Sequence, residues 1–276
     1  MNTSQKLGQK LTTTNPKPLI MGILNLTPDS FSDGGKFNTL KKALKRAEEI
    51  EKEGADLIDL GAESTGPGSK NVSAKEESDR LLPILKEIKK NISLPISVDT
   101  YKSLVAKESL EAGAAMINDV TGLRGDPQMV QVISKYQCLL TIMYSKDNSP
   151  RTTIKNKSYQ DIISEIKIFF KKRISHCLEN KIKKNKIILD PGMGHFLSAN
   201  PLCSFEIIAR LNELTTLNHP LLIGISRKSF LGGEIDKRDE KAKIPSIISY
   251  LNGAKIFRTH DVKGLRSFFD SFASTS

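Results

Sequence analysis

Short runs of consecutive apolar residues recur along the chain, and each run is followed by a longer segment with a different periodicity. The eight runs cover residues 19–24, 56–60, 94–98, 114–117, 139–143, 187–189, 221–225 and 254–257. Apolar character that is continuous, instead of alternating with polar residues, is typical of strands buried on both faces, as in a parallel sheet. The runs therefore predict eight parallel strands.

The segments between the runs have the periodicity of amphipathic helices. One apolar stripe comprises Leu40, Ala43, Leu44, Ala47 and Ile50, and a second comprises Ile162, Ile163, Ile166, Phe169, Phe170 and Ile174. Both stripes follow the spacing of one helix face, and lysines occupy the opposite face of the second. Gly54 follows the first stripe, at a position where glycine commonly ends a helix.

Eight strand and helix pairs within about 250 residues are typical of a (β/α)8 TIM barrel. We predict a single barrel domain over residues 18–276, preceded by a flexible, polar N-terminal segment over residues 1–17. An open, doubly wound sheet is the alternative fold. No linker rich in proline or serine divides the chain, so the sequence favours one domain.

The composition excludes several classes of protein. The 276 residues carry a net charge of +11, with 38% hydrophobic and 26% charged residues, which excludes a largely disordered chain. No apolar run approaches the roughly 18 residues that cross a membrane, and the polar N-terminus has no secretory signal, so we expect a cytoplasmic protein. The excess lysines lack interleaved aromatic residues, so we expect neither a nucleic-acid nor a membrane partner.

Several familiar catalytic motifs are absent from the sequence. There is no GxxxxGK[ST] phosphate loop, no HExxH helix and no GxSxG turn, and the four histidines lack the spacing of metal ligands. Cys138, Cys177 and Cys203 are far apart and odd in number, so we predict buried thiols and no disulfide framework. The chemistry is therefore expected to proceed without a covalent enzyme intermediate.

Hydrogen-bond acceptors follow three of the predicted strands. In a barrel of this kind, functional residues gather where the strands end. Asp99, Asn118 and Asp190 occupy such positions. This group suits a flat heterocycle with several N–H donors, because buried donors without partners are costly.

Cations follow the last two predicted strands. Arg227 and Lys228 come after the seventh strand, and Arg258 and His260 come after the eighth. Barrels often bind phosphate at these two positions, and guanidinium and imidazole donors suit a polyphosphate. The sequence thus predicts a ligand with a polar ring at one end and phosphate groups at the other.

Simpler interpretations of these residues stay open. Asp99 and Asp261 could each cap the following helix, and Arg258 could form an ordinary surface ion pair. The long first loop contains Gly34 and Gly35, which suit either a lid over the substrate or a plain irregular connection.

The strand-end sequences are distinctive as a set. They read MGILNLTPDSFSDGG at 21–35, GAEST at 61–65, SVDT at 97–100, IND at 117–119, DPGMG at 190–194, GISRKSF at 224–230 and RTHDV at 258–262. In this order they resemble dihydropteroate synthases, from about residue 18 to the C-terminus. The resemblance implies a dimeric barrel that condenses 7,8-dihydropterin-6-ylmethyl diphosphate with 4-aminobenzoate in folate synthesis, a reaction that sulfonamides inhibit by competing with aminobenzoate.

The resemblance also implies roles for residues around the pterin. Asp99, Asn118 and Asp190 resemble the residues with which the family reads the pterin ring. Lys228 resembles a lysine that lies along this ring, and Thr65 resembles a contact near the pterin diphosphate.

Further roles concern the diphosphate, the metal and the second substrate. Arg258 and His260 resemble diphosphate ligands, and together with Lys228 they are the expected catalytic residues. Asn25 resembles the contact to a Mg²⁺ cofactor. The aminobenzoate side of the site is represented by Phe31, Ser226 and Arg227.

The chain departs from the family pattern at several positions. Gly66 replaces a common arginine, His195 replaces a usual phenylalanine, and the sequence at 143–145 replaces a more usual Met-His-Met. Some of these features resemble the sulfonamide-insensitive relatives carried on mobile elements. We predict reduced sulfonamide affinity with retained turnover of aminobenzoate.

Three other functions are alternatives. A pterin-binding methyltransferase on a related barrel would not be expected to need the cations of the last two strand ends. A catalytically idle pterin-binding homologue is favoured only by Gly66 and His195, and a nucleic-acid binder only by the net charge.

Overall fold

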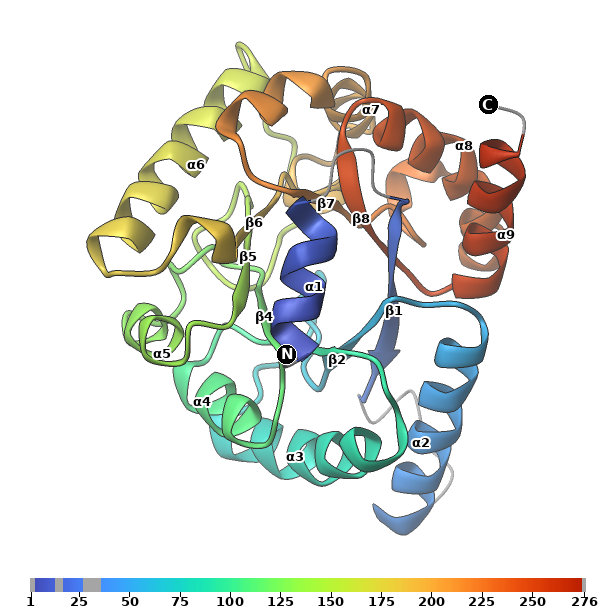
Figure 1. The fold of residues 1–276 in the computed structure, drawn as a ribbon. Helices are drawn as coiled ribbons and strands as arrows, with labels where there is room; N and C mark the ends of the chain where they lie inside the picture. The colour runs from blue at the N-terminus through green and yellow to red at the C-terminus, as the bar shows by residue number, and fades with distance from the viewer. Residues whose placement is uncertain (1–2, 13–16, 27–35, 275–276) are drawn as a thin grey trace.

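The computed structural model describes residues 3–12, 17–26 and 36–274, and its centre is a closed barrel of eight parallel strands (Figure 1). The strands follow one another around the barrel in chain order: β1 (Leu19–Asn25), β2 (Leu57–Gly61), β3 (Ile96–Asp99), β4 (Met116–Asp119), β5 (Leu139–Met143), β6 (Ile187–Asp190), β7 (Leu221–Ile223) and β8 (Ala254–Thr259). β8 pairs with β1, where Met21 lies beside Arg258. The predicted (β/α)8 barrel is confirmed, and the open-sheet alternative is wrong.

Helices surround the strands on the outside of the barrel (Figure 1). They are α2 (Lys36–Lys52), α3 (Ala74–Asn91), α4 (Ser103–Glu111), α5 (Met129–Tyr136), α6 (Ile162–Glu179), α7 (Leu202–Ala209), α8 (Arg238–Leu251) and α9 (Val262–Ala273). Short 3-10 helices cover Lys184–Lys186, Gly194–Phe196, Leu211–Leu217, Ser229–Leu231 and Ile235–Lys237. Within the described ranges, no helix is both long enough and apolar enough to cross a bilayer.

The strands are buried on both faces, as their continuous apolar character predicts. On the outer face, Ile58, Ile117 and Leu140 belong to the main core between sheet and helices. The packing there is close at Gly22 of β1, because a Cβ atom at this position would lie 2.5 Å from Ile50 Cγ2 of α2. Every predicted strand coincides with an observed strand to within two residues at either end.

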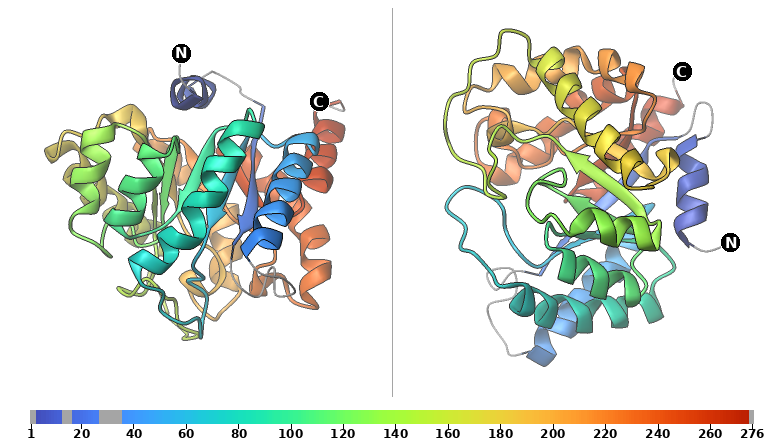
Figure 2. Two further views of the ribbon diagram at one scale, coloured as in Figure 1. Left: turned by 90° about the horizontal axis from the view of Figure 1, so that it is seen from below. Right: turned by 90° about the vertical axis from the view of Figure 1, so that its left-hand side faces the viewer.

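The amino-terminal end of the barrel interior is filled with apolar side chains. This lower layer comprises Leu19, Met21, Leu57, Met116, Leu139, Ile188, Leu222 and Ile256. Helix α1 (Thr3–Thr12) lies across this end of the barrel, and its Leu7 and Leu11 are buried against the layer (Figures 1 and 2). Within the segment 1–17, which we expected to be flexible, Thr3–Thr12 forms a helix that packs over this end of the barrel.

The barrel interior becomes polar toward the carboxyl ends of the strands. Five polar residues lie two positions beyond a member of the lower layer on their own strands: Asp59, Asn118, Thr141, Asp190 and Arg258. Because side chains alternate along a strand, these residues face the interior above the apolar layer. The change from apolar to polar places the candidate site at the carboxyl-terminal end of the barrel.

Candidate active site

Asp59 lies at the floor of this polar region. Its side chain is fully buried, and its Oδ2 atom accepts hydrogen bonds from Arg258 Nε at 2.6 Å and from Asn118 Nδ2 at 3.2 Å. We assigned no role to Asp59 from the sequence. The available signal was a carboxylate inside an otherwise apolar strand, since a buried charge needs a partner from elsewhere in the fold.

Arg258 joins two carboxylates of the site. While its Nε binds Asp59, its Nη2 donates to Asp99 Oδ2 at 2.9 Å. Asp99 is not a helix cap, because the residue that precedes α4 is Lys102. Desolvation raises the pKa of Asp99 to about 7, against the opposing effect of Arg258 and with the repulsion of Asp59. Arg258, whose side chain is 21% exposed, therefore bridges two carboxylates inside the barrel and is not part of an exposed surface pair.

Asp190 occupies the end of β6 and is also buried. Its Oδ1 accepts a hydrogen bond from the Gly192 backbone N–H at 2.8 Å. Desolvation raises the pKa of Asp190 to about 6, although this hydrogen bond and the charges of Lys228 and Arg258 act in the opposite direction. A ligand that donates hydrogen bonds to this carboxylate would favour its charged form.

Three polar atoms in the same region have no hydrogen-bond partner among the described residues. They are Asp59 Oδ1, Ser97 Oγ and Thr141 Oγ1, and all three side chains are fully buried. Buried polar atoms are normally satisfied, and an exception commonly marks the place of a ligand or an ordered water. The structure thus presents unpartnered polar atoms beneath the predicted acceptors.

Lys228 lies on the cationic side of the site. Its Nζ atom is 4.7 Å from the centroid of the Phe196 ring, a cation–π contact. Desolvation and the neighbouring Arg258 lower the pKa of Lys228 to about 8, while Asp190 and Asp99 oppose this shift. The structure therefore brings Lys228 together with the residues of both predicted groups.

Ser226 and His260 are in direct contact at the ends of β7 and β8. Ser226 Oγ lies 2.9 Å from His260 Nδ1 and accepts a hydrogen bond from the His260 backbone N–H at 3.1 Å. Ser226 is buried, whereas Arg227 is 42% exposed and has a φ of 58°, in the left-handed region that is strained for a residue with a side chain. Ser226 thus lies against His260 at the boundary between the predicted diphosphate residues and Arg227, the neighbouring residue that the resemblance places on the aminobenzoate side.

The remaining predicted residues lie around the site at the strand ends. Thr65 is half-buried, and its carbonyl accepts a hydrogen bond from the Thr152 backbone N–H at 3.2 Å, which joins the loops after β2 and β5. Asn25 ends β1 with an exposed side chain. Phe31 and the predicted lid glycines lie outside the described residues.

Comparison with known proteins identifies the family. Residues 21–260 match the family of pterin binding enzymes. The chain is 37% identical over 264 residues to the dihydropteroate synthase of Synechocystis sp., covering 94% of this chain and 90% of that protein. The chain belongs to the dihydropteroate synthase family.

Solved structures give the same result. The fold is similar to the dihydropteroate synthase of Clostridium difficile, determined in the presence of pteroic acid, with a TM-score of 0.86, 41% identity, and coverage of 94% of this chain and 97% of that one. It is also similar to the enzyme of Xanthomonas albilineans with 4-aminobenzoic acid, with a TM-score of 0.87, 32% identity, and coverage of 94% and 93%. The family and the barrel that the sequence motifs predicted are both confirmed.

The loop that contains Gly66 is held by an arginine from another loop. Arg151, from the segment after β5, donates to the carbonyls of Ser69 at 3.1 Å and Lys70 at 2.9 Å, and it also pairs with Glu63. Glu63 is almost completely buried. Arg151 therefore anchors the loop, but its guanidinium is engaged by a carboxylate.

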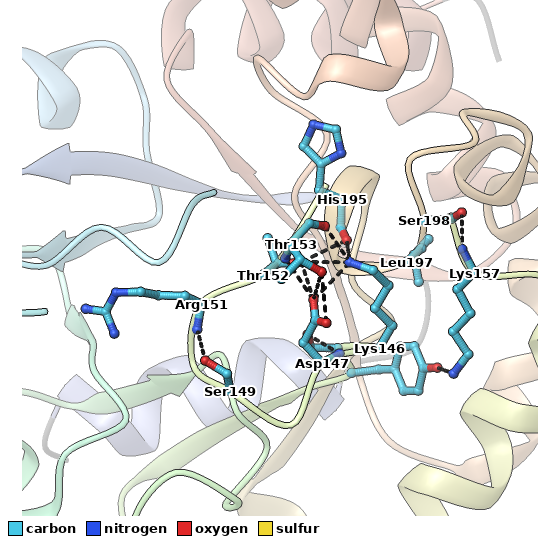
Figure 3. A network of polar contacts seen from close by, with 12 residues as sticks. Lys146, Asp147, Ser149, Arg151, Thr152, Thr153, Lys157, His195, Leu197 and Ser198 are labelled. Atoms are coloured by element: carbon cyan, nitrogen blue, oxygen red, sulfur yellow. Dashed lines mark hydrogen bonds and ion pairs between the residues drawn. The ribbon is translucent and has the colours of Figure 1, made fainter. Parts of the chain in front are cut away.

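A cluster around Lys146 holds the loops after β5 and β6 together (Figure 3). The nearly buried Lys146 Nζ donates to Asp147 Oδ2 at 2.9 Å, to the Thr153 carbonyl at 2.7 Å and to the His195 carbonyl at 2.5 Å. The His195 ring points away from this cluster (Figure 3), and its Nε2 lies 3.0 Å from Ser229 Oγ. The backbone of His195 is thus fixed while its ring lies beside the residue that follows Lys228.

Proposed function

We propose that this enzyme condenses 7,8-dihydropterin-6-ylmethyl diphosphate with 4-aminobenzoate to give 7,8-dihydropteroate and diphosphate. The observation that carries the proposal is the position of Arg258, which Asp59 and Asp99 hold at the boundary between acceptors and cations. A substrate that spans this boundary has hydrogen-bond donors at one end and phosphate groups at the other, as a pterin diphosphate does.

The acceptor side is proposed to bind the pterin ring. Asp99, Asn118 and Asp190 would accept hydrogen bonds from ring N–H and amino groups. The unpartnered atoms Ser97 Oγ and Thr141 Oγ1 below them would be completed by the ring or by a water beneath it. Lys228, which lies against the Phe196 ring, would extend along the pterin.

The cationic side is proposed to assist the departure of diphosphate. As the C–O bond to the methylene carbon breaks, Arg258 and His260 neutralise the charge that grows on the leaving group. The electron-rich pterin delocalises the positive charge on the methylene carbon, and Asp99 and Asp190 stabilise it by proximity. The arylamine nitrogen then attacks this carbon, forming the new C–N bond, and loses one proton to solvent. Because an aromatic amine is already nucleophilic, no strong general base is needed.

Mg²⁺ is the proposed cofactor. Mg²⁺ usually keeps several waters and takes one or two protein oxygen ligands together with substrate phosphates. Asn25 fits this pattern, because its exposed side chain lies at the end of β1 and carries an amide oxygen, a ligand type that Mg²⁺ accepts. When bound, the metal would neutralise charge on the diphosphate. In the described part of the chain no cluster of three carboxylate, histidine or cysteine ligands competes for this assignment.

4-Aminobenzoate is proposed to bind on the side of Ser226 and the exposed Arg227; Phe31, the third residue expected there, lies outside the described residues. His195 lies beside Lys228 through its contact with Ser229. Sulfonamide affinity is proposed to be reduced, because Gly66 removes a cation and His195 replaces an aromatic wall with a polar ring.

Product formation from the two substrates tests the proposal. Purified protein mixed with the pterin diphosphate, 4-aminobenzoate and Mg²⁺ should form dihydropteroate and release one diphosphate for each product molecule. A pterin-binding methyltransferase would release no diphosphate. An idle homologue would bind the pterin in calorimetry without forming product, and either result would overturn the proposal.

A homodimer is also proposed, formed through α7 and α8. Five large apolar side chains on these adjacent helices are 41% to 68% exposed: Leu202, Phe205, Ile244, Ile248 and Leu251. The two helices pack against each other (Figure 1), and their exposed apolar residues are proposed to belong to one face. An apolar face of this kind commonly marks an interface between proteins.

The organisation and location of the chain are proposed in the same way. Residues 18–276 would act as one pterin-binding domain. A cytoplasmic location is supported by the three free cysteines, of which Cys138 and Cys177 are buried, because unpaired thiols are typical of a reducing compartment.

A further inference from the structure

Asp239, in the first turn of α8, holds the residues that follow β7. Its carboxylate accepts a hydrogen bond from Ser226 Oγ at 2.6 Å through Oδ1 and one from Arg227 Nε at 2.8 Å through Oδ2. The Asp239 side chain is 11% exposed. One carboxylate thus binds two consecutive residues of the cationic side.

The contacts of Ser226 determine where its hydrogen lies. Its Oγ is 2.6 Å from Asp239 Oδ1, 2.9 Å from His260 Nδ1 and 3.1 Å from the His260 backbone nitrogen. A hydroxyl has one hydrogen to donate and two lone pairs to accept. Since an ionised carboxylate can only accept, the Ser226 hydroxyl donates to Asp239. The backbone nitrogen and the Nδ1 atom of His260 then both donate to this hydroxyl. The ring proton of His260 is therefore on Nδ1, and Nε2 carries a lone pair.

The surroundings of His260 keep its ring neutral. Burial, followed by the charges of Arg227 and Arg258 and by the weaker effect of Lys228, lowers the pKa of His260 to about 3, against the attraction of Asp239. On the backbone side, Arg46 of α2 donates to the His260 carbonyl at 3.3 Å.

The neighbouring Asp261 does not counter these cations at the ring. Its carboxylate accepts a hydrogen bond from the Gly264 backbone N–H at 2.9 Å and caps α9. At neutral pH the ring thus presents an unprotonated Nε2 among cations.

We propose that Asp239 is a positioning residue that, through Ser226, fixes His260 as the Nδ1–H tautomer and so couples diphosphate binding to the uptake of one proton at Nε2. This inference rests on the proposed function. A neutral Nε2 and a phosphate oxygen are both acceptors, so contact between them requires a proton. The proton comes from solvent, the imidazolium then donates from Nε2 to the phosphate, and the proton returns to solvent when diphosphate leaves.

The Asp239→Asn variant should reverse the direction of the hydrogen bonds that connect Asp239, Ser226 and His260. Arg227 Nε needs an acceptor, so the amide oxygen of the asparagine would face Arg227 and its NH₂ group would face Ser226. Ser226 Oγ would then accept from the amide and donate to His260 Nδ1. The ring would change to the Nε2–H tautomer and would present a donor before any phosphate arrives.

The tautomer can be measured directly by NMR of enzyme labelled with ¹⁵N-histidine. The chain has four histidines, so the His260→Gln variant identifies the signals of His260 by their loss. In the wild-type enzyme at pH 7, Nδ1 should be protonated and Nε2 unprotonated, and added diphosphate should convert the ring to imidazolium. In Asp239→Asn the two nitrogens should exchange roles. An Nε2–H ring in the wild-type enzyme, or the same tautomer in both proteins, would overturn the inference.

Kinetics provide a second measurement. Asp239→Asn should lower kcat on the order of 100-fold, because its neutral Nε2–H ring donates to the leaving group without a positive charge, with a nearly unchanged KM for the arylamine. Asp236→Asn, an exposed carboxylate in the preceding 3-10 helix, is the matched control and should retain wild-type kcat. If Asp239→Asn does not fold, Ser226→Ala keeps the Asp239–Arg227 pair and should also change the ring to the Nε2–H tautomer. The NMR result does not depend on turnover. An enzyme that makes no dihydropteroate would refute the proposed function, whereas the inference about Asp239 and Ser226 would still be tested by the tautomer of His260.

Discussion

Arg258 Nε lies 2.6 Å from Asp59 Oδ2, although 199 residues separate the two in the sequence. Arg258 comes from β8 and Asp59 from β2, and β1 lies between these strands in the barrel. The pair therefore spans three strands and fixes the direction of the guanidinium. The orientation of the Arg258 guanidinium in the site thus depends on Asp59, a carboxylate from the other neighbour of β1.

Asp59→Asn should impair the enzyme more than its modest change in shape suggests. The substitution keeps the hydrogen-bonding shape but removes the charge that holds Arg258. We expect kcat/KM to fall on the order of 100-fold, as for other losses of an oriented donor, and stability to fall by about 2 kcal/mol. Diphosphate release and thermal unfolding measure the two effects.

Asp56→Asn is the matched control for this prediction. Asp56 lies just before β2, at the opposite end of the barrel, where it pairs with Lys10 and Arg266. Loss of the Asp56 charge should reduce stability, while kcat/KM per folded molecule stays within about twofold of the wild-type value. Equal losses of activity in the two variants would contradict a specific role for Asp59.

The pH dependence of stability should reveal the raised pKa of Asp190. Its pKa is about 6 in the folded enzyme against 3.8 for the free side chain, so between these values the folded state keeps a proton that the unfolded state releases. Raising the pH through this window therefore lowers the free energy of unfolding, by at most about 3 kcal/mol at 1.4 kcal/mol per pKa unit. His260 acts in the opposite sense, because its pKa is lowered to about 3.

Comparing the pH-dependent stability of wild type with that of Asp190→Asn separates the contribution of Asp190 from that of His260. Chemical denaturation at pH 4, 5, 6 and 7 should show that the variant loses less stability than wild type, or gains more, as the pH rises. Parallel curves for the two proteins would show that Asp190 is not protonated in the folded enzyme at low pH.

Gly192→Ala should be strongly destabilising. Gly192 has a φ of +73°, and a Cβ atom there would lie 2.4 Å from the Tyr144 carbonyl oxygen. Gly68, with a φ of +77° and open space around it, is the matched control because it reports the backbone strain alone. We expect Gly68→Ala to cost about 1 kcal/mol and Gly192→Ala at least twice as much in thermal unfolding. Similar losses would show that the backbone near Tyr144 can move aside.

Ile248→Lys should convert the proposed dimer to a monomer. A lysine in the exposed apolar face of α7 and α8 would place an unpaired charge in the interface. Leu104→Lys on α4 alters a side chain that is similarly exposed, at 46%, but lies elsewhere on the barrel and should leave the mass unchanged. Light scattering of both variants and the wild type measures this, and a monomeric wild-type enzyme would refute the interface.

His195→Phe should increase sulfonamide affinity. The substitution removes the contact between His195 Nε2 and Ser229 Oγ and restores an aromatic wall. We expect the inhibition constant for sulfamethoxazole to fall by about tenfold, or 1.4 kcal/mol, with a smaller change in the KM for 4-aminobenzoate. A wild-type inhibition constant as low as that of a sensitive enzyme would contradict the prediction.

The sequence predicted the strand-end residues well because a closed barrel places all strand ends at one rim. Asp99, Asn118 and Asp190 needed only a correct position along each strand to be brought together. The same reasoning missed Asp59, which lies two residues deeper in the barrel than Asp99 and Asn118, because its strand was interpreted simply as apolar.

Asp239 and α1 could not be predicted for a different reason. Asp239 reaches Ser226 only because the chain between β7 and α8 follows an irregular path through two 3-10 helices, and no local pattern encodes that path. In α1, Leu7 and Leu11 have helical spacing, but two apolar residues within a short polar segment are too weak a signal.

The amino-terminal end of the barrel, where an apolar layer fills the interior beneath α1, has a kinetic consequence. With one end sealed, a ligand can reach the floor at Asp59 only from the opposite end, past the place proposed for the arylamine. The deeper substrate must then be first to enter, and arylamine that arrives too early obstructs it. A compulsory order of addition would thus follow from an apolar layer that touches neither reactant.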